Sequence, residues 1–180
     1  MGTTTTLVTV QEFLQLPEPE GQRIELIGGE VVSMPRAGYP HEVTKSNLIQ
    51  ILAVWIAQNR NWKLFSETAF RLDDYNSPIP DVSVVLRSRI QPGTKGIIHG
   101  APEVAIEVVS SETAANLESK IELYLAHGSK SVWVAFPEHR SIRIFDATRR
   151  SKKFEQSQMF EDPDVLQGFQ VPVAAIFEGV

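Results

Sequence analysis

The sequence predicts an α/β protein built on a mixed β-sheet. Short apolar runs rich in β-branched residues, typical of strands, alternate with segments whose apolar residues recur every third or fourth position, typical of amphipathic helices. Other strand-like runs follow one another with only a short turn between them, which indicates hairpins. Strands separated by helices, combined with hairpins, favour a central mixed sheet flanked by helices.

The composition indicates a compact domain. The chain has 180 residues, of which 42% are hydrophobic and 22% charged, so we expect one domain that spans residues 1–180. There is no cysteine, which excludes disulfides and thiolate metal sites and agrees with a reducing cytoplasm. We find neither a signal-peptide pattern nor a run approaching about 18 apolar residues, so we expect a cytoplasmic location and no membrane contact.

The net charge restricts the classes of partner. At −5, with a pI of about 5.4, the chain lacks the large positive surface of proteins that coat nucleic acid nonspecifically. This balance still allows an enzyme that combines acidic metal ligands with a local basic groove. Candidates for phosphate contacts are Arg87, Arg89, Lys95 and the basic cluster at 149–153, although such clusters are usually solvated turns.

The first half of the chain predicts a short helix, a hairpin and a long helix. Thr9 is a helix N-cap, and Pro17 ends the helix that follows it. Residues 23–35, "RIELIGGEVVSMP", predict two apolar strands around a Gly-Gly turn. From about His41 to Asn59, apolar residues recur at spacings of three and four, which predicts the longest helix of the chain.

The second half predicts further strands and one helix. Residues 62–72 and 79–87 are strand-like and are joined by the turn-forming segment "DDYNSP". A buried strand at 104–109 precedes a helix that runs from about residue 112 to residue 126 and ends before a glycine. Residues 131–137 and 141–147 then predict a strand pair.

Two carboxylates lie in or beside the predicted buried strands. Asp81 follows Pro80 at the start of one strand, and Glu107 lies inside the apolar run 104–109. Isolated buried carboxylates are energetically costly, and two of them close together repel each other, so such a pair usually has a cation beside it. With oxygen ligands only, the expected cation is Mg²⁺ or Mn²⁺, which can activate water and stabilise charge on a phosphate.

A lysine occupies the apolar face of the helix that follows Glu107. Lys120 lies three residues after Leu117 and four before Tyr124, within the stripe that faces the core. A lysine in that position needs a partner of opposite charge. If the helix folds back along the sheet, Glu107 or a bound phosphate would supply that charge.

Taken together and in order, these segments resemble a known family. The motifs "IPDVSVV", "PEVAIEVVSSET" and "LESKIELYLAHGSKSVWVAFPE", preceded by "RIELIGGEVVSMP" and "HEVTKSNL", resemble the Uma-type endonuclease family. That family is placed in the PD-(D/E)XK nuclease superfamily. The resemblance runs from about Arg23 to Glu138 and implies the restriction-endonuclease-like fold.

The resemblance also implies an activity and roles for individual residues. It makes Asp81 and Glu107 metal ligands and Lys120 the catalytic lysine of a DNA endonuclease that hydrolyses phosphodiester bonds with metal-activated water. In the superfamily's common pattern the lysine stands two residues after the second acid, where this chain has Val109. The Uma-type family has moved it to the next helix, which matches Lys120. A homodimer is also implied, because cutting both strands of DNA needs two sites.

Three further residues match positions that are often polar in relatives. His41 stands at the start of the long helix, and Glu25 and Glu67 lie in predicted strands beside apolar residues. Each could support the site, the two glutamates as additional metal ligands. From the residues alone, a helix-entry role for His41 and an exposed strand face for the glutamates stay open.

Two other classes of function stay open as well. The chain could be a non-catalytic DNA-binding or protein-interaction module in which Glu107 and Lys120 form a structural ion pair. The family often has an acid where this chain has Asn116 and Phe136, as a drifted member would show. The third class is a metal-dependent phosphodiesterase that acts on RNA or a small nucleotide. Asp81 could itself simply cap a turn.

Overall fold

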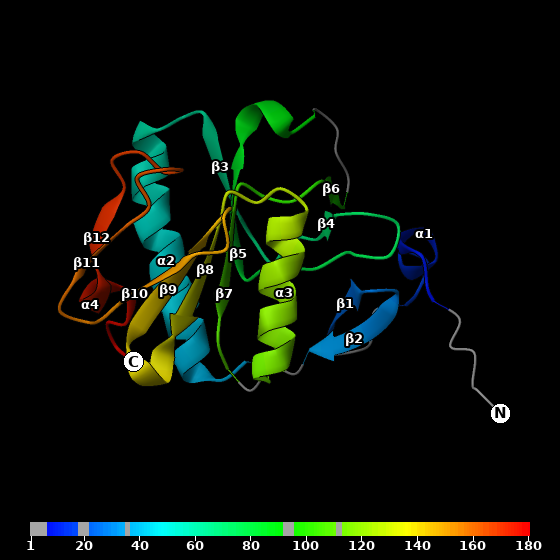
Figure 1. Ribbon diagram of the computed structural model, residues 1–180, viewed down its shortest axis with the longest axis horizontal. Helices are drawn as coiled ribbons and strands as arrows, with labels where there is room; N and C mark the ends of the chain where they lie inside the picture. The colour runs from blue at the N-terminus through cyan, green and yellow to red at the C-terminus, as the bar shows by residue number, and fades with distance from the viewer. Residues whose placement is uncertain (1–6, 18–21, 35–36, 92–95, 111–112) are drawn as a thin grey trace.

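The computed structural model describes residues 7–17, 22–34, 37–91, 96–110 and 113–180. Its centre is a six-stranded mixed sheet, seen nearly edge-on in Figure 1. From one edge to the other the strands are β10 (Ser151–Phe154), β9 (Ser141–Asp146), β8 (Ser131–Phe136), β7 (Val104–Val108), β5 (Val82–Leu86) and β3 (Trp62–Ser66). β7 and β8 run parallel, and every other neighbouring pair in this sheet is antiparallel.

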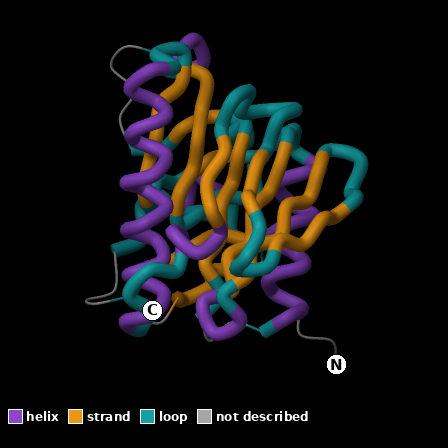
Figure 2. Tube along the Cα trace, turned by 90° about the vertical axis from the view of Figure 1, so that its left-hand side faces the viewer, coloured by secondary structure: helices purple, strands orange, loops and turns teal. Residues whose placement is uncertain are grey.

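Helices lie on both faces of the sheet (Figure 1), and Figure 2 shows the strands side by side in a view turned by 90°. The helices are α1 (Val10–Phe13), α2 (Tyr39–Gln58), α3 (Ala114–Ala126) and α4 (Val173–Ile176), with 3₁₀ turns η1 (Arg87–Arg89) and η2 (Pro137–His139). α2 begins with Pro40 in its first turn, a position that suits a residue without an N–H donor. α3 begins after Thr113, whose hydroxyl accepts a hydrogen bond from the Asn116 N–H.

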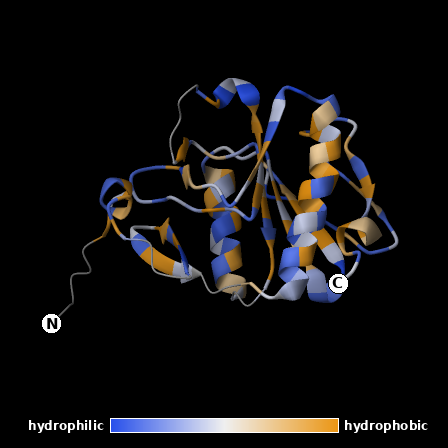
Figure 3. Cartoon of the chain, turned by 180° about the vertical axis from the view of Figure 1, so that it is seen from behind, coloured by the Kyte–Doolittle hydropathy of each residue, from blue (hydrophilic) through white to orange (hydrophobic). Residues whose placement is uncertain are grey.

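The side-chain alternation of β7 assigns its residues to the two faces. Val104, Ile106 and Val108 pack with α2 and the C-terminal segment in the larger core, whereas Ala105 packs with α3 in a smaller one. Glu107 therefore points to the α3 face from the middle of an apolar strand. Figure 3 shows hydrophobic colour concentrated in the strands between the helices, while the helices carry both colours, as amphipathic helices do.

Among the described residues, three two-stranded sheets flank this centre. They pair β1 (Arg23–Ile27) with β2 (Glu30–Met34), β4 (Phe70–Arg71) with β6 (Ile98–His99), and β11 (Met159–Glu161) with β12 (Gln170–Pro172). A single bridge between Leu26 and Ser77 ties the β1–β2 hairpin to the segment before β5. This bridge brings β1 close to the start of β5.

The predicted α/β class, with a mixed sheet flanked by helices, is confirmed. Thr9 caps the first helix through a reciprocal capping box, and the hairpin, the long helix and the strands around Asp81 and Glu107 form where they were expected. The predicted start of α3 near residue 112 lies outside the described residues. No described helix is long and apolar enough to span a bilayer.

Two predicted segments differ from the structure. Residues 62–72 do not form one strand, because the backbone leaves the sheet at Glu67, whose φ of 50° is left-handed, and then pairs elsewhere as β4. Glu67 is therefore in a turn rather than in a strand. The polar segment after residue 147 contains the edge strand β10, whose lysines suit an exposed sheet edge.

Candidate active site

Asp81 and Glu107 meet at one end of the sheet because β5 and β7 pair antiparallel. Val82 pairs with Ile106, which puts Asp81, one residue before β5, beside the carboxyl end of β7. There the backbone N–H of Val108 donates to Asp81 Oδ2 at 2.8 Å. Asp81 is 3% exposed and Glu107 is 2% exposed. The fold thus brings the two acids together in a buried position.

α3 brings Lys120 to the same place. Lys120 Nζ lies 2.8 Å from Glu107 Oε1, and the residue is 4% exposed. One turn later, Tyr124 donates its hydroxyl to the same Glu107 oxygen at 2.9 Å. Glu107 is one of the two partners that the position of the lysine in the apolar stripe predicts, the other being a bound phosphate.

Glu25 enters the site from β1. Its Oε1 lies 3.4 Å from Lys120 Nζ and accepts a hydrogen bond from the Ile79 N–H at 3.0 Å. The residue is buried, so it does not belong to an exposed strand face. Glu25 and Glu107 therefore hold Lys120 between two carboxylates.

His41 and Arg23 contact Asp81 from the other side. His41, in the first turn of α2, has Nε2 at 3.1 Å from Asp81 Oδ2 and Nδ1 at 3.3 Å from Glu42 Oε1. Arg23 Nη2 lies 3.4 Å from Asp81 Oδ1. Asp81 thus receives contacts on both oxygens, and His41 belongs to the site as well as to the start of the helix.

Glu67 lies at the outer rim of this cluster, with about half of its side chain exposed. It is 3.1 Å from Arg23 and 2.8 Å from Lys45, and Lys45 is in turn 2.8 Å from Glu42. These near contacts form a ring of charged and polar side chains, in which the buried Nδ1 of His41 makes no hydrogen bond with Glu42. In order around the ring its members are Asp81, His41, Glu42, Lys45, Glu67 and Arg23.

The environment shifts the pKa values of the two buried acids, Asp81 and Glu107, in opposite directions. Burial, helped by the negative charges of Asp81 and Glu25, raises the pKa of Glu107 to about 8, although Lys120 acts against this. Burial also disfavours ionisation of Asp81, but hydrogen bonds from His41 and Val108 outweigh it and hold the pKa of Asp81 below its usual value. Lys120 loses hydration on burial, yet the charges of Glu107 and Glu25 raise its pKa.

The charges at the site do not balance. Five carboxyl groups face three permanent cations, which leaves a formal charge of −2 when His41 is neutral and Glu107 is ionised, and of −1 when Glu107 holds a proton below its pKa of about 8. The carboxylates are those of Glu25, Glu42, Glu67, Asp81 and Glu107, and the cations are Arg23, Lys45 and Lys120. A divalent cation would neutralise this surplus, and carboxylate oxygens are the donors that Mg²⁺ and Mn²⁺ prefer.

The carboxylates now face N–H and O–H donors rather than one another. Among the described residues, no three His, Asp or Glu side chains converge into a preformed metal site. The donor chemistry and the surplus charge fit a hard divalent cation. Binding one would require Asp81 and Glu107 to exchange some of their present contacts.

The sequence matches one family over nearly its whole length. The model of the Uma2 family, described as "Putative restriction endonuclease", matches residues 10–174. The chain belongs to this family. The matched range includes every residue of the candidate site. No curated protein matches this Uma2-family chain at a significant level.

A solved structure shares the fold of the Uma2-family chain. The crystal structure of "a putative nuclease belonging to DUF820" from Anabaena variabilis matches with a TM-score of 0.83 and 24% identity, covering 94% of this chain and 97% of that one. This match confirms the predicted fold class. The "cryoEM structure DrdV-DNA complex" matches with a TM-score of 0.37 and 12% identity, over 77% of this chain and 14% of that one, which is too distant to support an inference.

The sequence analysis missed four residues of the candidate site. They are Arg23, Glu42, Lys45 and Tyr124. Glu42 directly follows His41 in the sequence. Arg23, Lys45 and Tyr124 each repeat a helix or strand spacing from a predicted site residue, two positions along β1 or four positions along α2 and α3. The same periodicities that define the apolar faces could therefore have identified them.

The basic residues proposed for phosphate contacts lie away from the acids of the Uma2-family chain. Arg87 and Arg89 follow β5 at the opposite end of the sheet, where Arg89 pairs with Glu103 at 3.0 Å. The cluster at 149–153 starts in the turn between β9 and β10, also at that end. Lys95 lies outside the described residues.

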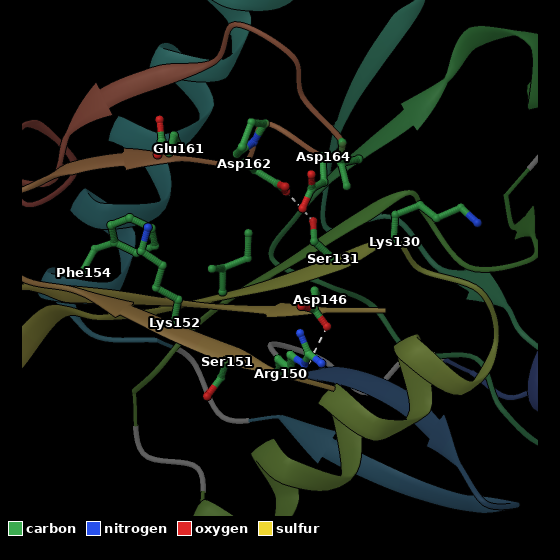
Figure 4. Close-up of a pocket in the computed structure, with 13 residues that line it drawn as sticks. Lys130, Ser131, Asp146, Arg150, Ser151, Lys152, Phe154, Glu161, Asp162 and Asp164 are labelled. Atoms are coloured by element: carbon green, nitrogen blue, oxygen red, sulfur yellow. Dashed lines mark hydrogen bonds between the residues drawn. The ribbon is translucent and has the colours of Figure 1, made fainter. Parts of the chain in front are cut away.

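A surface pocket of about 240 Å³ lies at this opposite end of the Uma2-family chain (Figure 4). The basic side chains Lys130, Arg150 and Lys152 surround it together with several acids. One of these acids, Asp162, accepts hydrogen bonds from Ser131 Oγ at 2.5 Å and Trp133 Nε1 at 2.9 Å. None of the residues that line the pocket belongs to the candidate site, so the pocket is separate from the carboxylate cluster.

Proposed function

We propose that this chain is a metal-dependent endonuclease that hydrolyses phosphodiester bonds in DNA. The observation that carries the proposal is the meeting of Asp81, Glu107 and Lys120, three buried side chains from separate elements, at one end of the sheet. Membership of a family described as "Putative restriction endonuclease" supports the same activity. The surplus negative charge at the site supports its dependence on a divalent metal.

Asp81 and Glu107 are the residues that would hold Mg²⁺ or Mn²⁺. Their oxygens are hard donors, and both acids lie at the carboxyl end of β7. When bound, the metal supplies a Lewis acid that stabilises charge on the phosphate and makes a water molecule more acidic. Glu25 and Glu67 are candidates for supporting roles through Lys120 and Arg23, which they contact directly.

The contacts of the remaining side chains suggest how they assist. Lys120 is a donor that can orient the attacking water or a phosphate oxygen once it releases one of its two carboxylate partners. His41 orients Asp81 through Nε2. In the reaction the water oxygen bonds to phosphorus and gives up one proton, the bond from phosphorus to the leaving oxygen breaks, and the leaving oxygen takes up one proton.

The proposal extends to the assembly and surroundings of the enzyme. We propose a homodimer, because cutting both strands of DNA needs two sites. We also propose that residues 1–180 form one domain, and the absence of cysteine supports a reducing, cytoplasmic location. The measured mass in solution at working concentration tests the first of these statements.

One contact favours a second candidate, a non-catalytic module on the same scaffold. Lys120 already pairs with Glu107 and Glu25, and buried ion pairs of this kind also occur as structural elements. Such a module would not bind divalent metal at Asp81. Its buried charges would affect stability alone.

Metal binding separates the two candidates. We would titrate the folded chain with Mn²⁺ by calorimetry and compare it with Asp81→Asn and Glu107→Gln. Asp162→Asn is a matched control, because Asp162 is also a buried carboxylate but lies at the opposite end of the sheet. We expect binding by the wild type and by Asp162→Asn, and at least tenfold weaker binding by the two site variants.

Cleavage is then measured with Mg²⁺ on supercoiled plasmid and on a single-stranded RNA. We expect nicked and linear plasmid from the wild type and a loss of at least 100-fold for Lys120→Met. RNA cleavage alone would move the chain to the third class of function. Absence of Mn²⁺ binding up to millimolar metal, both with and without DNA, would favour the non-catalytic module.

A further inference from the structure

Tyr124 places a hydroxyl group against a proposed metal ligand. The residue lies on α3 and is completely buried. Its hydroxyl donates to Glu107 Oε1 at 2.9 Å, and Lys120 Nζ approaches the same oxygen at 2.8 Å. Two donors on successive turns of one helix therefore contact the same oxygen of Glu107.

Packing alone does not account for this hydroxyl. The ring of Tyr124 lies in an apolar cluster with Ala105, Ile121, Val132 and Val134. A phenylalanine ring would fill the same space without a polar atom. Burying a hydroxyl group is costly unless it forms a hydrogen bond, and among the described residues its partner is Glu107.

The contact constrains Glu107 more than the ion pair alone does. A lysine ammonium group is a rotating point charge on a long flexible stem, so it attracts a carboxylate without fixing its orientation. The tyrosine hydroxyl is held by a rigid ring whose position is set by packing. Tyr124 can therefore fix the rotation of the carboxylate about its terminal bond.

Asp81 offers a parallel on the other side of the site. The rigid backbone N–H of Val108 donates to Oδ2 of this acid, as the rigid Tyr124 ring does for Glu107. Each of the two acids is thus oriented by one donor that cannot move freely. Metal ligands are typically oriented by outer hydrogen bonds of this kind.

We propose that Tyr124 is a positioning residue that orients the Glu107 carboxylate for a divalent cation. The proposal rests on the metal site of the proposed nuclease function. Tyr124 itself is not a ligand in this arrangement, because its hydroxyl hydrogen is directed to Glu107 Oε1. Loss of the hydroxyl would weaken metal binding while the fold is retained.

The test compares Mn²⁺ affinity of the full chain and its variants at one fixed pH. Tyr124→Phe removes the hydroxyl alone, and we expect the Kd for Mn²⁺ to rise about tenfold or more. Tyr75→Phe is the matched control, since Tyr75 is 43% exposed and lies outside the site. Its Kd should stay within about twofold of the wild-type value.

A second control separates orientation from general loosening of the core. Ile121→Val removes a methylene group from the same apolar cluster and keeps the Tyr124 hydroxyl, so it lowers the Tm but should leave the Mn²⁺ affinity unchanged. The electron paramagnetic resonance spectrum of bound Mn²⁺ should change in Tyr124→Phe and not in Ile121→Val. Equal weakening of metal binding in both variants would overturn the proposal.

The remaining outcomes are also decisive. If Tyr124→Phe binds Mn²⁺ as tightly as the wild type, Tyr124 has no positioning role, but the metal site stands. If the wild type binds no Mn²⁺, the metal site and the positioning role both fail. If Tyr124→Phe does not fold, 3-fluorotyrosine introduced at position 124 alters the strength of the donor, and an unchanged Mn²⁺ affinity would then contradict the proposal.

Discussion

Buried carboxylates have different surroundings at the two ends of the central sheet. At one end Asp162 is buried against neutral donors, the hydroxyl of Ser131 and the indole N–H of Trp133. At the other end Asp81 and Glu107 share their surroundings with permanent cations and with further acids. Both ends give their buried carboxylates hydrogen-bond partners, but the site end also holds a buried lysine, Lys120, between two carboxylates.

The proposed function depends on this difference between the two ends. Burial raises the pKa of Asp162, and hydrogen bonds from Ser131 and Trp133 oppose the rise, so one acid is matched by two fixed donors. Around Glu107, the three buried acids Glu25, Asp81 and Glu107 instead share one buried lysine, Lys120. Neutral donors stabilise a buried acid without adding charge, whereas the proposed metal binding depends on carboxylates that share a cation.

Removal of Lys120 should have the largest effect on stability. Lys120→Met leaves Glu107 and Glu25 without their shared cation, which we expect to lower the free energy of unfolding by about 3–5 kcal/mol at pH 9. At pH 5 the loss should be smaller, because Glu107, with a pKa of about 8, then carries its own proton. Urea denaturation at the two pH values measures both losses.

The control for this change is Lys130→Met at the opposite end of the sheet. Lys130 is exposed beside the pocket, so its removal should change the free energy of unfolding by less than about 0.5 kcal/mol at either pH. If Lys120→Met is no more destabilising than this control, Lys120 does not compensate buried charge, and the comparison between the two ends is wrong.

The second-largest effect is the dependence of stability on pH, which we expect to come mainly from Glu107 at the site end. The raised pKa of Glu107 means that the folded chain holds a proton that the unfolded chain releases between its ordinary value near 4.5 and about 8. Stability of the metal-free chain should therefore fall as pH rises through this window, by up to about 1.4 kcal/mol per pH unit, and then level off. Urea denaturation at intervals between pH 5 and 9 measures the slope.

Two variants identify the group whose titration causes this dependence of stability on pH. The lowered pKa of Asp81 contributes below this window, since its stabilisation is lost only as pH falls through the folded pKa, and the raised pKa of Lys120 contributes above it. Glu107→Gln should therefore remove most of the slope, and Asp162→Asn should leave most of it. A slope that survives in Glu107→Gln would mean that another group titrates.

Much of the fold was predictable because local patterns and tertiary packing agree in most elements. The capped helix at Thr9 and the apolar strand around Glu107 both formed where the sequence indicated. The prediction of one strand over residues 62–72 was wrong for a physical reason. A glutamate rarely adopts a left-handed φ, and no local sequence pattern indicates the turn at Glu67. β10 was missed because an edge strand needs few apolar residues.

The centre of the site was predictable for a different reason. Charged residues in apolar runs stand out in a sequence, and this singled out Glu107 and Lys120. Arg23 and Lys45 were missed because they lie at the rim, where a cation is ordinary, and their partners come from distant segments. Tyr124 was taken for core, and its role as a donor depends on how α3 is rotated against β7.

Removal of the Ser131 hydroxyl should have a moderate effect, confined to the pocket end. Ser131→Ala deprives buried Asp162 of one of its two side-chain donors, which we expect to cost about 1.5–3 kcal/mol, since hydrogen bonds to charged groups are the stronger ones. Mn²⁺ affinity should stay unchanged. Weaker metal binding in Ser131→Ala would show that the two ends are coupled.

The smallest effect concerns two of the three described non-glycine residues with left-handed backbone. Glu67 has φ 50° at the site end, and Arg149 has φ 65° in the turn between β9 and β10. Arg149→Gly relieves the strain and loses only an exposed pair with Glu122, so it should stabilise the chain by about 0.5 kcal/mol. Glu67→Gly relieves similar strain but removes a partner of Arg23 and Lys45, so it should destabilise the chain.

Thermal unfolding of the two glycine variants measures this difference, with Arg149→Ala as the control that removes the exposed pair and keeps the strain. If Arg149→Gly raises the Tm and Glu67→Gly lowers it, the ion pairs of Glu67 with Arg23 and Lys45 stabilise the chain by more than the left-handed backbone costs. Equal stabilisation in both would mean that backbone strain alone decides, because the contacts of Glu67 with Arg23 and Lys45 would then contribute nothing measurable. The rim of the site would in that case be as dispensable for folding as a surface turn.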